Sequence, residues 1–297
     1  QPSRRRDALE VRRDPAPDAG AGGHELTVLG RACSAWRRWR DDRICRRHAI
    51  PEALWTLTLA RYPFLTWRST DEQILLRRLT TLFLARKEFS GAQGFVVTDE
   101  IAVAVAAQAV LPVLKLGLGL YDGFVGIVMH DDAVVAQREV VDDDGVVHHF
   151  EEELSGEAMH GGPVMLSWTD VAAASMSDPW GYNVTIHEFA HVIDMVDGMA
   201  DGVPAMRDSR SRQAWLSVME PAYADFCQRV DADQPVAIDP YAAESIDEFF
   251  AVASETFFVD PDTLHQAMPR VYALLADYFG QSPRNDLQAR ARTPASG

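Results

Sequence analysis

The motif HEFAH at residues 187–191 constrains this chain more than any other part of its sequence. It lies in an apolar stretch that we expect to form a helix over 182–197, which Asn183 or Thr185 can begin and Gly198 can end. Residues four apart lie on one face of a helix, one turn apart, so the two histidines of the motif face the same side. The fold must therefore bury the apolar side of this helix and give the histidine side a shared partner.

Two imidazoles one helical turn apart can bind a single metal ion, at about 2.0–2.1 Å for zinc. We therefore assign His187 and His191 as metal ligands. Glu188 points to the side, where its carboxylate can accept a proton from a water that the metal activates. Asp194 follows His191 by three residues and therefore lies close to the ligand face. We expect it to accept a hydrogen bond from a histidine N–H. This arrangement is typical of the zincin class of metallopeptidases.

Three residues compete as the third ligand. Asp197 follows the second histidine by six residues, which turns it about 240° around a continuous helix and away from the ligand face. An apolar helix expected over 245–258 carries Glu248 and Glu255, seven residues apart and therefore on one face. A carboxylate there needs a partner, which a metal would supply, although Glu248 could instead form a capping box with Ser245. The spacing leaves all three candidates open.

The order of expected elements predicts an α+β fold: N-terminal helices, a small mixed sheet, and a helical C-terminal half that carries the metal site. Apolar spacing is helical over 51–87, with a break at Tyr62-Pro63. The middle of the chain changes to β-branched runs, with a hairpin turn signal at 142–145. We expect strands at 95–98, 124–129, 133–141, 146–150 and 162–168, and later helices at 169–176, 182–197, 210–231, 245–258 and 264–279.

Charge and cysteine content exclude some functions. The net charge of −16 argues against nucleic-acid binding, although residues 1–47, with twelve Arg and seven acidic residues, carry about +5 and leave about −21 for the rest. The three cysteines form no CxxC pair, and their odd number argues against a disulfide framework. No apolar segment of the signal-peptide type follows the N-terminal arginines. We therefore expect a cytoplasmic protein.

One apolar stretch, residues 101–120, has the length of a membrane span. Gln108, Pro112 and Lys115 interrupt it, whereas a span needs about 20 uninterrupted apolar residues. We expect a buried helix up to Leu111, followed by a turn, and no membrane partner.

The chain divides into three parts by composition. We expect a poorly ordered, Arg-rich segment over 1–48, a zincin-like metallopeptidase domain over 49–282, and a C-terminal tail over 283–297.

Several separated blocks, in the same order, resemble the Mlc titration factor A family of metallopeptidases. They are HEFAHVIDMVDG and the later DPYAAESIDEFFAVASETFF, with LPVLKLGLGLYDGF and GPVMLSW upstream. The resemblance covers roughly residues 50–280. It implies a cytosolic zinc peptidase of the aminopeptidase type, acting on a peptide or protein substrate.

The resemblance also implies roles for single residues. Zinc would be bound by His187, His191 and Glu248, with Glu188 as general base and Tyr241 stabilising the transition state. A phenol in that place can donate to a developing oxyanion. The family takes its name from binding Mlc, a glucose-responsive transcriptional repressor. This gives the alternative function: a regulatory protein that sequesters a repressor, with a structural or vestigial zinc site.

Overall fold

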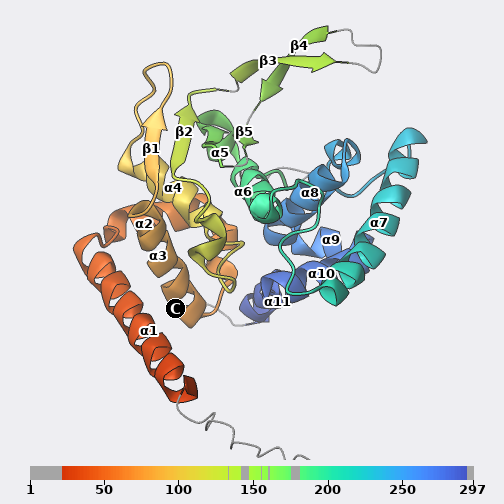
Figure 1. Cartoon of the computed structure of the whole chain (residues 1–297). Coiled ribbons are helices and arrows are strands. Elements are labelled where there is room, and N and C mark those ends of the chain that lie inside the picture. Colours follow the sequence, from red (N-terminus) through yellow and green to blue (C-terminus); the bar gives the residue numbers. More distant parts are fainter. Residues whose placement is uncertain are drawn as a thin grey trace, which may run out of the picture.

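A computed structural model describes residues 22–132, 134–141, 147–154, 156–159, 161–174 and 181–292. Figure 1 shows the N-terminal helices and a small sheet on one side, the helices α7 to α11 on the other, and α6 between them. The α-helices are α1 (Gly22–Arg47), α2 (Glu52–Arg61), α3 (Thr70–Leu84), α4 (Asp99–Ala109), α5 (Trp168–Ala173), α6 (Val184–Asp194), α7 (Ser209–Asp231), α8 (Ile246–Val259), α9 (Pro261–Ala267), α10 (Pro269–Phe279) and α11 (Pro283–Arg292). Four short 3-10 helices join them: η1 (Pro63–Trp67), η2 (Leu118–Tyr121), η3 (Met195–Asp197) and η4 (Pro240–Ala243).

The main sheet is mixed and has the strand order β1-β2-β6-β5. Its strands are β1 (Glu88–Gly91), β2 (Gly126–His130), β6 (Val164–Ser167) and β5 (Gly156–Ala158). The first three are parallel, and β5 runs antiparallel to β6 at the edge. Two further strands, β3 (Val134–Val141) and β4 (Val147–Leu154), form a separate antiparallel pair. The α+β fold predicted from the sequence is confirmed, and the arrangement is zincin-like.

The apolar side of α6 is fixed by an aromatic cluster from the N-terminal half of the chain. Phe189 lies inside the HEFAH motif and is fully buried. Its ring packs edge-to-face against Phe83 of α3, Tyr121 of η2 and Phe124, with centroids 5.7, 5.0 and 5.9 Å away. Aromatic pairs in this geometry stabilise a core beyond the area that they bury. The cluster therefore holds the back of the helix while its histidine side faces the other way.

A second aromatic cluster fixes α8 within the C-terminal half. Phe250 packs against Trp215 of α7 with ring centroids 5.6 Å apart, and Phe257 and Phe258 pack against Phe279 of α10 at 5.7 and 5.0 Å. Nearly every residue of α8 from Phe249 to its end is buried. The helix that carries both candidate glutamates therefore lies in a rigid, apolar setting.

Gly202 joins three helices in the loop between α6 and α7. Its N–H donates to Asp194 Oδ2 at the end of α6 (2.9 Å), and its carbonyl accepts from Trp215 Nε1 of α7 (2.8 Å). Its φ is +69°, and a Cβ at this position would lie 2.6 Å from the carbonyl oxygen of Ile246 at the start of α8. Only glycine combines that conformation with so close an approach. The spacing of α6 and α8 is therefore set partly by this residue.

Most expected elements are confirmed. The helices over 51–87 break at Tyr62-Pro63, and α4 ends at Ala109 before a turn. None of the described helices combines the length and apolar character that crossing a membrane requires. Gly198 has the left-handed conformation (φ 98°) expected at the end of the motif helix. The expected hairpin turn at 142–145 lies outside the described residues.

The strand expected at 95–98 is wrong. The strand is β1, seven residues earlier, because pairing with β2 decides its position. After β1 the chain turns back sharply, so that a Cβ on Gly91 would collide with the carbonyl of Phe95, and Phe95 N–H donates to Ala92. Thr98 then caps α4 through Ile101 N–H. The β-branched residues that suggested a strand form the approach to a helix.

The two ends of the chain and one late helix differ in part from the expected elements. Within the segment 1–48, residues 22–47 form α1, and Asp41 and Asp42 of this helix pair with Arg86 and Arg78; residues 1–21 lie outside the described part of the chain, so the expectation for this segment as a whole stays a prediction. The single helix expected over 264–279 is two helices, because Pro269 lacks the N–H that would continue α9. Helix α11 begins where the C-terminal tail was expected. The division into three parts stays a prediction.

Asp194 gives the fold a testable pH dependence. Its carboxyl is fully buried, one of its oxygens has no hydrogen-bond partner in the described part of the chain, and this burial raises its pKa to about 7. A raised pKa stabilises the folded state at low pH, and this contribution is lost as the pH rises towards the folded pKa. In metal-free protein, urea unfolding between about pH 4 and 8 should show a fall in the free energy of unfolding, by on the order of a few kcal/mol.

The Asp194→Asn variant should lose part of this fall, because its amide cannot ionise and can still accept from Gly202. Subtracting the two pH profiles isolates Asp194 from other titrating groups. Parallel profiles for the variant and the wild type would show that Asp194 does not titrate in this range.

Candidate metal centre

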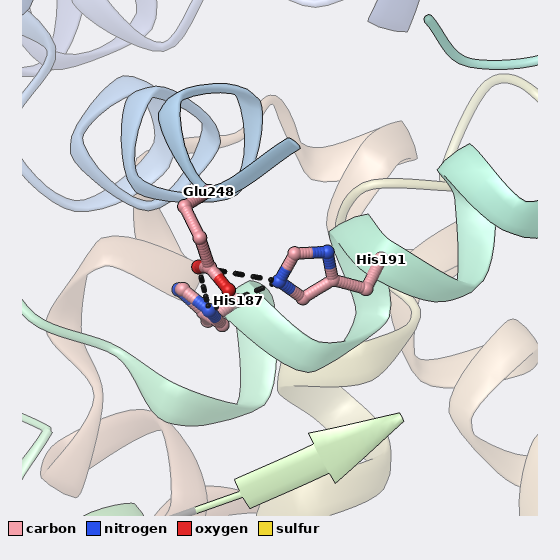
Figure 2. A group of neighbouring side chains, drawn as sticks. All are labelled: His187, His191 and Glu248. Carbon is pink, nitrogen blue, oxygen red and sulfur yellow. Dashed lines mark hydrogen bonds and ion pairs between the residues drawn. The ribbon is translucent and has the colours of Figure 1, made fainter. Parts of the chain in front are cut away.

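The two motif histidines and Glu248 converge between α6 and α8, as Figure 2 shows. Asn183 caps α6 by accepting from Ile186 N–H (2.9 Å). The Nε2 atoms of His187 and His191 lie 3.2 Å apart, and Glu248 Oε2 lies 3.0 and 3.4 Å from them. The structure thus brings together three of the residues that the sequence singled out as ligands.

The donor atoms fit a cation. His187 Nδ1 lies 2.6 Å from the Glu255 carboxylate, which can only accept, so Nδ1 carries a hydrogen. The lone pair of His187 Nε2 then faces the lone pairs of His191 Nε2 and Glu248. Glu248 Oε2 is buried, and among the described residues only these two imidazoles lie in a position to satisfy it. Three facing acceptors repel one another unless a proton or a metal ion lies between them, so this group can hold a metal ion.

The pKa values of these groups follow the same logic. Burial alone would lower the pKa of His187, but Glu255 and Glu248 outweigh it and raise that pKa well above its ordinary value. Burial alone would raise the pKa of Glu248, but the two histidines outweigh it and lower that pKa strongly. The metal-free site therefore favours a proton on the imidazole and a charge on Glu248. A metal must displace that proton when it binds.

Glu188 lies beside the three converging residues, against the edge strand β5. Its side chain is buried, and this desolvation raises its pKa to about 7 despite the neighbouring histidines. A Cβ on Gly156 would lie 2.5 Å from Glu188 Oε1 and 2.7 Å from its Cγ. The backbone of β5 therefore touches the carboxyl group directly, and only a residue without a side chain permits this. Nothing in the local sequence around Gly156 indicated this contact.

Tyr241 reaches the site from η4, on the solvent side. Asp239 begins this 3-10 helix by accepting from the N–H of Tyr241 (2.9 Å). The tyrosine hydroxyl lies 3.4 Å from Glu248 Oε1, and its ring centroid lies 6.2 Å from that of His187. Its side chain is 45% exposed, so the hydroxyl stands at the border between the site and solvent. The structure thus brings Tyr241 next to Glu248, while its role in catalysis stays a prediction.

The other candidate ligands lie elsewhere. Asp197 is exposed beyond the end of α6 and accepts from Met199 N–H (3.4 Å). Asp194 accepts from Gly202, so the hydrogen bond to a histidine that we expected for it is wrong. The capping-box interpretation of Glu248 is half right, because Ser245 accepts from Glu248 N–H while the Glu248 side chain turns to the histidines. Glu255 lies behind His187, where it contacts Nδ1.

Comparison with known proteins agrees with this geometry. The sequence profile of a family described as glucose-regulated metallo-peptidase M90 matches residues 36–280. Mlc titration factor A of Cronobacter sakazakii is 34% identical over 260 residues, which is 86% of this chain and 95% of that protein. Mlc titration factor A of Escherichia coli is 32% identical over 248 residues, or 82% and 91% of the two chains.

A third relative, an uncharacterised protein of Synechocystis, is 34% identical over 251 residues, which is 84% of this chain and 90% of that protein. The resemblance to the Mlc titration factor A family is confirmed over most of the chain. The match extends twelve residues before residue 48, into α1. By these matches and by the group of two histidines and a glutamate, the chain belongs to the glucose-regulated metallo-peptidase M90 family.

Proposed function

We propose that this metallopeptidase is zinc-dependent and cleaves peptide bonds, with His187, His191 and Glu248 as ligands and Glu188 as general base. The observation that carries the proposal is that His187, His191 and Glu248 converge with their lone pairs facing one another. The buried carboxyl group of Glu188 lies beside them and is outside this group of ligands. A structural zinc site is normally closed by four protein ligands, whereas a catalytic site has three and leaves one position open. Zinc would supply a Lewis acid that lowers the pKa of a water and polarises the carbonyl to be cleaved.

Glu188 suits the role of general base. Its buried carboxyl group lies beside the three candidate ligands, where it can accept a proton from a water that the metal would activate. The backbone of β5 at Gly156 lies close to this carboxyl group and leaves it little room on that side. Burial also excludes competing hydrogen bonds with bulk water. These properties support a catalytic role over a structural one.

The substrate would bind as an extended chain beside β5. Among the described strands, β5 pairs with β6 alone and forms the edge of the sheet. The free edge of a strand can accept a peptide through backbone hydrogen bonds. Such a peptide would run directly past Glu188, because β5 touches that residue. The aminopeptidase type of cleavage follows from the resemblance, and amino-acid anilides are the substrates that test it.

A second candidate function is the binding of a regulator. The named relatives are Mlc titration factors, and they match this chain over most of its length. A transcriptional repressor such as Mlc would then be a partner of this chain, in addition to a peptide or protein substrate. The two functions separate cleanly, because the loss of the general base should end catalysis and leave binding of a protein partner unchanged.

We further propose that the protein works in the cytoplasm. The two cysteines whose side chains are described, Cys45 and Cys227, are free thiols, which suits a reducing compartment.

The Glu188→Gln variant should keep the metal and lose turnover of amino-acid anilides by on the order of 10²–10⁴, since an amide cannot accept the proton. Zinc content and hydrolysis rate are measured on the same preparation, with a chelator-treated sample beside it. Glu220→Gln, the same change at an exposed position of α7, is the control and should act like the wild type. Full activity in Glu188→Gln, or activity that a chelator leaves untouched, would rule out this mechanism.

The Tyr241→Phe variant should lower kcat by on the order of 10²–10³ and change KM little, because the hydroxyl is needed only when charge develops on the carbonyl oxygen. Tyr223→Phe is a matched control, since the Tyr223 hydroxyl donates to Ala243 of the same 3-10 helix without facing the metal ligands. A loss of less than about threefold in Tyr241→Phe would return this residue to a packing role.

The Glu248→Ala variant should abolish tight zinc binding, measured by competition with a chromogenic chelator. Asp197→Ala, which removes an exposed carboxylate just beyond the end of α6, should bind zinc as the wild type does. If Glu248 only capped α8, its loss would cost about 1 kcal/mol of stability and leave zinc in place. Thermal unfolding of the metal-free variants distinguishes these two results.

A further inference from the structure

A chain of buried polar side chains lies behind His187, on the side away from Glu248. It consists of Gln108 from α4, Asn183 at the start of α6 and Glu255 from α8. Their exposed fractions are 0%, 0% and 3%, so each is as buried as the apolar core around it. Buried polar groups of this kind destabilise a fold unless their hydrogen bonds are satisfied. Three separate helices thus meet in one polar network next to a metal ligand.

The hydrogen bonds of this network lead to the imidazole one after another. Gln108 Nε2 donates to the carbonyl of Ala104, one turn earlier in its own helix, at 3.1 Å. Gln108 Oε1 accepts from Asn183 Nδ2 at 2.7 Å. Asn183 N–H donates to Glu255 Oε2 at 2.6 Å, and Glu255 Oε1 lies 2.6 Å from His187 Nδ1. Each group has a single arrangement that satisfies its neighbour.

The two oxygens of Glu255 are therefore both engaged, one by a backbone N–H and one by the imidazole. The backbone N–H of Asn183 cannot change its role, because an N–H group can donate a hydrogen bond but cannot accept one. It fixes the carboxylate in the plane that receives His187 Nδ1–H. The other tautomer of His187 would place a lone pair 2.6 Å from a carboxylate oxygen, and a ring turned over would place Cδ2–H there without a hydrogen bond; both are unfavourable in a buried site. Only one ring orientation and one tautomer fit, and both direct Nε2 at His191 and Glu248.

We propose that Glu255 is a positioning residue that holds His187 in the orientation and tautomer needed to bind the metal, and that Asn183, braced by Gln108, holds Glu255. The proposal rests on the metal site of the proposed function, but it concerns metal affinity and does not depend on the reaction. Outer carboxylates that accept from a metal-binding histidine typically contribute 10- to 100-fold to metal affinity.

Asn183 has two tasks in this arrangement. Its side-chain oxygen caps α6 by accepting from Ile186 N–H, and its side-chain nitrogen reaches Gln108. The helix that carries the ligands therefore begins at the residue that also fixes the carboxylate behind one of them. A change at 183 can be chosen that keeps the cap and removes only the link to Gln108. Serine is such a residue, because it is among the preferred N-caps.

The experiment compares zinc affinity, by chelator competition, in the wild type, Glu255→Gln, Asn183→Ser and Ser254→Ala. The glutamine keeps the shape of Glu255 but turns an N–H towards one of its two donors. We expect a 10- to 100-fold loss of affinity in Glu255→Gln and a smaller loss in Asn183→Ser. Ser254 neighbours Glu255 and is fully buried, yet its hydroxyl donates only within α8, to Phe250. Ser254→Ala should therefore bind zinc as the wild type does.

Two further measurements separate positioning from stability. Thermal unfolding of the metal-free variants measures the cost to the fold, and the absorption spectrum of the Co²⁺-loaded proteins reports the ligand geometry. We expect an altered Co²⁺ spectrum in Glu255→Gln and an unchanged one in Ser254→Ala, even where both lower the melting temperature. Wild-type zinc affinity in Glu255→Gln would overturn the proposal; should that variant not fold, Glu255→Asp, whose shorter side chain draws the carboxylate away from His187 Nδ1, is measured in its place, and wild-type affinity there would overturn the proposal.

The outcome is independent of catalysis. A chain that hydrolyses no anilide but loses zinc affinity on Glu255→Gln would refute the proposed function and support the positioning role. If the wild type hydrolyses anilides while Glu255→Gln binds zinc like the wild type, the proposed function is supported and the positioning role of Glu255 is refuted.

Discussion

Three carboxyl groups and two imidazoles lie close together in a largely apolar interior. The repulsion among the three carboxylates is the constraint that the surrounding structure must balance. Glu188, Glu248 and Glu255 all lie within reach of the motif histidines. Their combined charge in a buried setting is unfavourable unless cations or protons compensate for it. The metal-free site does this with a proton on His187 and a raised pKa on Glu188. A divalent metal would supply the same compensation in a single ion.

The two halves of the chain divide the work of holding these groups together. The N-terminal half supplies the aromatic cluster that receives Phe189 and so fixes the back of α6. The C-terminal half encloses α8 in its own aromatic core. Gly202 links α6 to α7 and α8, and the buried chain behind His187 links α6 to α4 and α8. The positions of the three candidate ligands are therefore set by packing and hydrogen bonds outside the group itself, as the rigidity of such sites requires.

Much of the site was predictable because its signals are local. The spacing of HEFAH, the N-cap at Asn183 and the left-handed Gly198 are all properties of one helix, and all were predicted. The third ligand was not fixed by spacing, since Glu248 and Glu255 share a face of α8. The resemblance favoured Glu248, and the structure brings it to the histidines while Glu255 lies behind them.

What the sequence could not reveal depends on contacts between distant segments. Glu255 and His187 are 68 residues apart, and Gln108 is 75 residues from Asn183, so no local pattern reports their hydrogen bonds. The same reason explains the misplaced strand. The β-branched residues at 95–98 favour extended backbone, but partner strands decide where a sheet forms, and β2 pairs with Glu88–Gly91 instead. The types of most secondary-structure elements were predicted correctly from the sequence, but the partners that these elements contact in space could not be.

The contact between Gly156 and Glu188 has a consequence for how this protein can be altered. At this point the wall of the site is main chain, so its depth cannot be tuned by exchanging one side chain for another. A mutant library aimed at new substrates gains nothing from diversity at position 156, whereas the adjacent positions 157 and 158 of β5 still offer side chains to vary. A change of specificity in this part of the site would therefore come from positions 157 and 158 and leave Gly156 unchanged.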